Sequence, residues 1–77
     1  MIEADLIHLI ETTAGVEGMI GDRAARAFKT GAGYKMEAWW VGLPDPGSEN
    51  NYHTHSVFEL IREMRKEIPL SYWTEID

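Results

Sequence analysis

The chain has 77 residues and a formal net charge of −6 at pH 7, which limits it to a single domain, residues 1–77, with a small core. It contains no cysteine, so disulfides, thiol catalysis and cysteine-ligated zinc are excluded. A core of this size typically supplies only about 3–5 kcal/mol of net stability. We therefore expect contacts with a partner chain to supplement it.

The negative charge also bears on the class of partner. A surface of this sign is repelled by phosphate backbones and by anionic lipid, so direct binding to nucleic acid or membrane is not expected. No apolar run approaches the roughly 18 residues of a spanning helix. The N-terminal residues Met1–Asp5 lack the basic region of a signal peptide, so secretion is not expected.

The first expected element is an amphipathic helix that begins near Ile2 and ends at Thr12-Thr13 and Gly15. Its apolar residues recur with a period of 3.6 and lie on one face: Ile2, Leu6, Leu9 and Ile10. A second apolar group at residues 16–20 is expected to form one more helical turn that packs back on the first helix. Residues 21–23 then form a turn.

A β-hairpin is expected over residues 24–42, with Gly31-Ala32-Gly33 as its loop. Strand alternation divides its second half into two faces. The first face carries Tyr34, Met36, Ala38 and Trp40, and the second carries Lys35, Glu37, Trp39 and Val41. The second face becomes apolar toward its end, which indicates that Trp39 and Val41 are covered there.

Residues 43–54 are expected to form a loop, because Pro44, Pro46 and Gly47 disfavour regular structure. The sequence Ser56-Val57-Phe58-Glu59 has the form of a capping box and predicts the start of a second helix. This helix runs to about Glu67, and Pro69 ends it. Alternation over residues 70–77 predicts a final strand.

The resulting order, α-β-β-α-β, predicts an α+β two-layer sandwich with both helices on one face of a small, mainly antiparallel sheet. The other face is exposed unless a second chain covers it. Trp39, Val41 and Trp73 are placed on that face, where they indicate a protein interface. The alternative is that these side chains fold over the edges of their own core.

The candidate metal ligands are His53 and His55, which alternate along an extended segment near Asp45 and Glu49. Two imidazoles on one side of such a segment could bind a transition metal with a carboxylate as third ligand. The favoured interpretation leaves one histidine near the second helix and the other in solvent, with no metal and no cofactor. The sequence has no Ser-His-Asp spacing and no phosphate-binding loop, so an enzyme is not expected.

The first 23 residues, MIEADLIHLIETTAGVEGMIGDR, resemble the N-terminus of small tail-completion or tail-terminator proteins of long-tailed bacteriophages. The matching positions are Met1, Ile2, Glu3, Leu6, Leu9, Ala14, Gly15, Val16, Ile20, Gly21, Asp22 and Arg23. The chain departs from the family at Ala24-Ala25-Arg26, where an aromatic residue and a proline are usual. Family members are also usually longer, with an additional strand.

The resemblance implies a virion structural protein whose subunits form a ring, commonly sixfold, at the head-proximal end of the tail tube. Its partners would be copies of itself and other tail proteins, and it would reside in the virion or the host cytoplasm. Expected contact sites are the hairpin tip from Lys29 to Tyr34, the loop from Pro44 and Asp45 to His55, and the tryptophans Trp39 and Trp73.

An acidic inhibitor is the alternative function. Small acidic phage-encoded proteins of the anti-CRISPR or DNA-mimic type occupy basic grooves on a host protein, and spaced carboxylates can imitate phosphate charge. The thirteen acidic residues of this chain are spread along the sequence, whereas a mimic concentrates them on one face.

Overall fold

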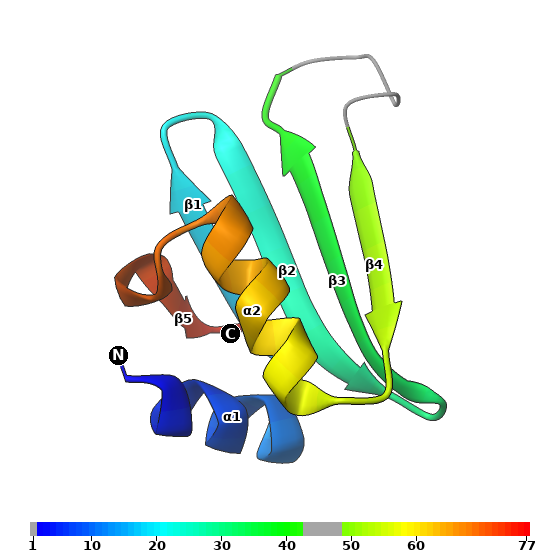
Figure 1. The fold of residues 1–77 in the computed structure, drawn as a ribbon. Helices are drawn as coiled ribbons and strands as arrows, with labels where there is room; N and C mark the ends of the chain where they lie inside the picture. Colours follow the sequence, from blue (N-terminus) through cyan, green and yellow to red (C-terminus); the bar gives the residue numbers. More distant parts are fainter. Residues whose placement is uncertain (1, 43–48) are drawn as a thin grey trace.

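The computed structural model describes residues 2–42 and 49–77. The elements in chain order are α1 (Glu3–Thr12), β1 (Val16–Ile20), β2 (Arg23–Thr30), β3 (Gly33–Trp40), β4 (Asn50–Thr54), α2 (Val57–Glu67), a 3-10 turn η2 (Leu70–Tyr72) and β5 (Trp73–Glu75). The strands form one antiparallel sheet in the order β4-β3-β2-β1-β5. Both helices pack on the same face of it (Figure 1). The predicted α+β two-layer class is confirmed.

The length of the helices is modest. α1 has 10 residues and α2 has 11, and neither of these two described helices is long and apolar enough to cross a membrane.

Two strands of the sheet, β1 and β4, differ from the elements predicted for these residues. Residues 16–20 form β1 and not a further helical turn, because Val16 and Gly18 face the core while β2 and β5 pair on either side. Residues 50–54, predicted as loop, form β4 along β3. Its residues are mostly polar, so the sequence does not show the apolar alternation that predicts a strand. Backbone pairing with β3 holds this strand in the sheet. The order is therefore α-β-β-β-β-α-β.

The local signals of the hairpin and the second helix are confirmed. β2 and β3 pair from Arg23↔Trp40 to Thr30↔Gly33 around a two-residue turn. Ser56 caps α2, and its hydroxyl accepts a hydrogen bond from the Glu59 amide at 3.4 Å. The Glu59 carboxylate does not complete the box, because it accepts instead from the Thr54 hydroxyl at 2.8 Å.

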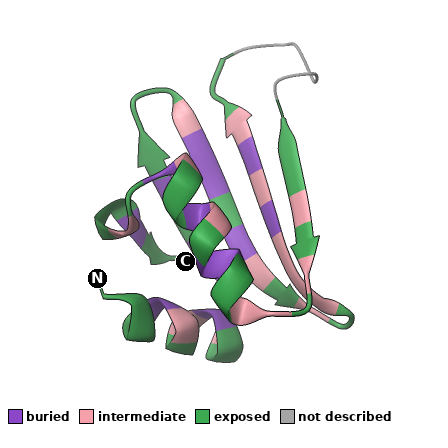
Figure 2. Cartoon of the chain, viewed as in Figure 1, coloured by how far each residue is buried: buried purple, intermediate pink, exposed green. Residues whose placement is uncertain are grey.

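The core lies between the helices and the sheet, and Figure 2 shows its buried residues along the facing sides of both layers. Its members are Leu6, Ile10, Val16, Ala25, Ala27, Met36, Ala38, Leu60, Ile61, Met64, Ile68 and Trp73. Trp73 is the largest fully buried side chain, and its indole Nε1 donates to the Ile68 carbonyl at 2.9 Å.

The prediction that Trp73 lies on the exposed sheet face is therefore wrong. Residues 70–72 form a 3-10 turn, so only Trp73–Glu75 continue as strand. In this register Trp73 shares the inner face with its partner Gly18, and Tyr72 is exposed. Burying an indole removes more apolar surface from water than burying the smaller neighbouring side chains, which favours this register.

Candidate protein-binding surface

The sheet face away from the helices is the candidate site. Pairing aligns Met19, Ala24 and Trp39 on neighbouring strands. Their neighbours Gly18, Ala25 and Ala38 point to the buried side. Because side chains alternate along a strand, the row Met19–Ala24–Trp39 points to the opposite, open side.

An apolar cluster occupies one end of this face, and we define it as the open-face patch: Met19, Trp39, Val41 and Tyr72. Met19, Val41 and Tyr72 are 53%, 45% and 52% exposed, and Trp39 is half-buried. Ala24 beneath them is only 3% exposed, although both described helices lie on the other face of the sheet (Figure 1). Met19, Trp39, Tyr72 and Ala24 line one depression of about 260 Å³. Three of the four patch residues thus lie around one depression over Ala24, and the patch presents apolar surface to solvent.

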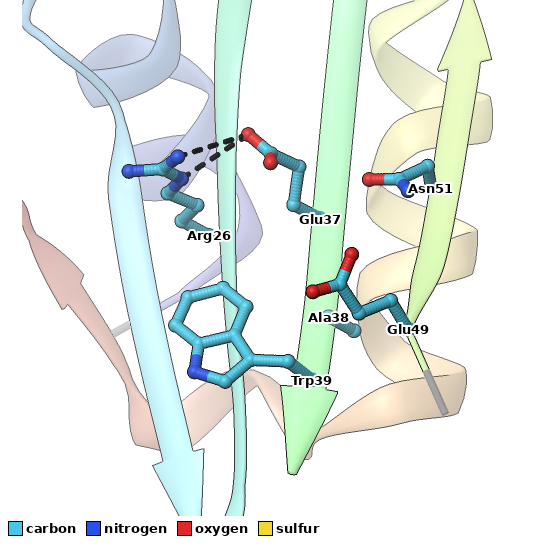
Figure 3. Close-up of a pocket in the computed structure, with 6 residues that line it drawn as sticks. All are labelled: Arg26, Glu37, Ala38, Trp39, Glu49 and Asn51. Carbon is cyan, nitrogen blue, oxygen red and sulfur yellow. Dashed lines mark hydrogen bonds and ion pairs between the residues drawn. The ribbon is translucent and has the colours of Figure 1, made fainter. Parts of the chain in front are cut away.

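Polar side chains border the patch along the open face. Arg26, Glu37, Glu49 and Asn51 lie with Trp39 around a second depression of about 320 Å³ (Figure 3). Arg26 Nε donates to Glu37 Oε1 at 3.2 Å across the β2–β3 pair. An apolar centre beside a mixed, hydrogen-bonding rim is the usual composition of a protein–protein interface.

The predicted contact residues at the hairpin tip, Lys29 and Tyr34, form hydrogen bonds to Glu11 at the end of α1. Lys29 Nζ donates to Glu11 Oε2 at 2.9 Å, and the Tyr34 hydroxyl donates to Glu11 Oε1. These bonds hold the end of α1 against the hairpin on the helix side of the sheet. The Tyr34 and Lys29 hydrogen bonds lower the pKa of Glu11, and the Glu11 carboxylate raises the pKa of Lys29 and of Tyr34.

The two histidines lie near this same tip. His53 and His55 are exposed and line a depression with Thr30, Ala32 and Tyr34. Glu49 lies four residues before His53, roughly 13 Å along an extended segment. Within residues 2–42 and 49–77, no three histidine, aspartate or glutamate side chains gather closely enough to hold a metal ion. The candidate carboxylate Asp45 lies outside the described residues.

The predicted contact residues are thus divided among several places. Trp39 and Val41 belong to the open-face patch by strand alternation, whereas Trp73 is buried and Lys29 and Tyr34 form hydrogen bonds to Glu11 on α1. Pro44, like Asp45, lies outside the described residues.

Sequence reasoning missed Met19 and Tyr72. Met19 carried no clear strand signal, because the apolar residues Val16, Met19 and Ile20 recur at i, i+3 and i+4, the spacing of a helix and not the alternation of a strand. The exposure of Tyr72 follows from the inward position of its neighbour Trp73, which the sequence did not predict.

Comparison of the chain with protein-family models, with curated proteins and with solved structures finds no match.

Proposed function

We propose that the protein is a non-enzymatic virion structural protein of the bacteriophage tail-completion or terminator type, which assembles through protein–protein contacts. The observation that carries the proposal is the open-face patch. A 77-residue chain leaves one face of its only described sheet without a covering layer, and the apolar side chains gather at one end of that face.

The energetics favour covering this patch. Removing apolar surface from water contributes about 25 cal/mol per Å², so burying about 200 Å² contributes about 5 kcal/mol before the costs of association. This gain is comparable with the net stability of about 3–5 kcal/mol that a core of this size supplies. A neighbouring subunit on the open face would therefore change the stability of the chain substantially.

The charge distribution supports this function over an acidic inhibitor. Carboxylates on α1, β3 and α2 are already paired with cations: Glu3 with Arg65, Glu11 with Lys29, Glu37 with Arg26, Glu63 with Lys66 and Glu67 with Arg23. A phosphate mimic presents unpaired carboxylates on one face. Here the pairs are spread over both layers of the fold.

The test is the assembly state of the purified chain, measured by native mass spectrometry and light scattering from micromolar to millimolar concentration. We expect species larger than a dimer, and we expect Val41→Glu to abolish them and to lower the melting temperature only to that of the wild type at a concentration too low for assembly. Phe58→Glu is the matched control, because Phe58 is 70% exposed on α2, away from the sheet's open face. Species no larger than a dimer at every concentration, or equal effects of both substitutions, would contradict the proposal.

A further inference from the structure

The strand β4 forms one edge of the sheet, and no other strand among the described residues pairs with the backbone groups on its outer side. β4 pairs with β3 on one side, and the sheet ends there among the described residues. Asn50, Asn51 and His53 are exposed. An edge strand of this kind can accept another strand through main-chain hydrogen bonds.

The direction of each β4 backbone group follows from the ladder. The Val41 amide donates to the Asp22 carbonyl at 2.7 Å, so residues 22 and 41 form a hydrogen-bonded pair. Hydrogen-bonded and non-hydrogen-bonded pairs alternate in an antiparallel ladder, and the β2–β3 register is uninterrupted. The backbone groups of Tyr34, Met36 and Ala38 therefore point to β4.

Their partners in β4 must point back. Tyr34 pairs with Thr54, Met36 with Tyr52 and Ala38 with Asn50, so Asn50, Tyr52 and Thr54 use their N–H and C=O groups on β3. The backbone groups of Asn51 and His53 consequently point outward, toward the free edge.

The other edge of the sheet confirms this assignment. The Ile76 amide donates to the Gly15 carbonyl at 3.0 Å, which makes residues 15 and 76 a hydrogen-bonded pair between β1 and β5. Following the alternation through β1 and β2 gives the same set of hydrogen-bonded pairs between β2 and β3 as the Val41–Asp22 bond.

The residues of β4 itself are not of the types that usually protect an edge strand against pairing. Natural edge strands are commonly very short or carry lysine, proline or inward-pointing charge. β4 has five residues, Asn50-Asn51-Tyr52-His53-Thr54, with no lysine, proline or carboxylate. The opposite edge strand, β5, has three residues and ends at Glu75. In a chain with net charge −6, β4 is an edge along which two copies meet with little repulsion.

We infer that β4 is a self-association edge, on which a second copy of this chain adds its own β4 in antiparallel orientation about a two-fold axis at Tyr52. This register places Asn51 opposite His53 of the second copy, and His53 opposite its Asn51. The outward N–H and C=O groups of these residues then form four main-chain hydrogen bonds across the axis.

The side chains are compatible with this register. Asn51 and His53 lie on the open face, where an amide and an imidazole can form a hydrogen bond. On the helix side, the two half-buried Tyr52 side chains face each other as an aromatic cross-strand pair. None of the cross-strand pairs in this register contains a carboxylate, a lysine or an arginine.

The helices leave room for the pairing. α2 packs across β2, β3 and β4, and the β3 strands of the two copies would lie about 14 Å apart, three strand spacings. Because α2 lies over β3, the two α2 helices would be separated by a similar distance. This separation exceeds the roughly 8–10 Å between the axes of helices in contact, so the helices do not clash. The two open faces would lie on the same side of one continuous sheet, so the open-face patch stays accessible in both copies. The inference therefore does not depend on the proposed function.

A cysteine scan in this cysteine-free chain tests the register. Tyr52 forms a non-hydrogen-bonded pair with itself, and such pairs have Cα atoms about 4.5 Å apart, within the range that a disulfide spans. Asn50 or Thr54 would be about 14 Å from the same residue of the second copy. Under mild oxidation, we expect Tyr52→Cys to give a covalent dimer at least about tenfold faster than Asn50→Cys or Thr54→Cys.

A second variant, Asn51→Pro, tests the same register independently, in case Tyr52→Cys impairs folding. Asn51→Pro keeps all pairing with β3, because the N–H that it removes points outward, and proline is tolerated at such edge positions. We expect it to weaken dimerisation at least about tenfold in sedimentation equilibrium, with two hydrogen bonds lost across the axis. Equal oxidation rates at residues 50, 52 and 54, or a dimer unaffected by Asn51→Pro, would overturn the inference, as would a chain that stays monomeric at millimolar concentration.

Discussion

The backbone of Gly18 lies directly against the indole ring of Trp73. A Cβ atom at residue 18 would be 3.0 Å from Cδ2 and 3.2 Å from Cε2 of that ring. The two residues are cross-strand partners of β1 and β5 on the buried side of the sheet. The largest buried side chain is thus accommodated by the absence of a side chain opposite it.

Gly18→Ala should therefore destabilise the protein. The added methyl group must displace a ring held on all sides, and overpacking of this kind costs typically about 1–3 kcal/mol. Urea denaturation followed by Trp fluorescence measures the change. Gly31→Ala is the control, because nothing lies within 4 Å of a Cβ there. Similar unfolding midpoints for the two variants would show that the ring can move aside freely.

Trp73→Phe should also destabilise the chain, for a second reason. The substitution removes the donor to the Ile68 carbonyl, and leaving a buried acceptor unsatisfied costs about 1–3 kcal/mol in addition to the lost packing. Thermal denaturation by circular dichroism checks this. The exposed aromatic Tyr72 offers the comparison, since Tyr72→Phe should shift the melting temperature little. If Trp73→Phe is as stable as the wild type, the indole hydrogen bond contributes nothing measurable.

Glu67→Ala should weaken the attachment of α2 to the sheet. Arg23 Nε and Nη2 both donate to Glu67 Oε2, at 2.9 and 2.8 Å, and the two side chains are only 13% and 18% exposed. Hydrogen bonds to such charged groups contribute about 1.5–3 kcal/mol, so we expect a loss of about 2 kcal/mol in the free energy of unfolding.

Lys66→Ala is the control for this pair, because Lys66 and Glu63 form a pair on an exposed helix surface. Such surface pairs contribute about 0–1 kcal/mol. Chemical denaturation should rank the two variants clearly, and an equal loss would mean that the Arg23–Glu67 pair contributes no more than a surface pair.

The Glu11 cluster predicts a pH dependence at both ends of the scale. The pKa of Glu11 is lowered from 4.5 by Tyr34 and Lys29, so its contribution to stability is present above about pH 4.5 and is lost as pH falls through the lowered pKa. The pKa values of Lys29 and Tyr34 are raised from 10.5 and 10.0, so their contribution is lost as pH rises through the raised values.

Melting temperatures of the wild type and Glu11→Gln measure this dependence. The wild type should be the more stable protein near neutral pH, and the difference should shrink at both acidic and strongly alkaline pH. A difference that stays constant across the range would contradict the assignment of the pH effect to this carboxylate.

Local signals in the sequence determined several elements of the fold. The 3.6-residue period and the Ser56 cap predicted α2, and the glycine-rich turn after Thr30 predicted the β2–β3 hairpin. These features depend on neighbours within a few residues, where backbone preference, capping and turn conformation act. The two-layer class followed, because two amphipathic helices require a sheet on which to bury their apolar faces.

Only the tertiary structure decided β1, β4 and the position of Trp73. β1 pairs with segments both near and far along the chain, Ala27 and Glu75 against Val16, and β4 is a polar strand that exists through its backbone bonds to β3. A shift of one residue in a strand exchanges its two faces, and the choice depends on which face the helices cover. The sequence by itself determined that the protein is a small α+β domain with more apolar side chains than its core buries. The packing of its two layers decided that Trp39 and Val41, and not Trp73, present apolar surface to solvent.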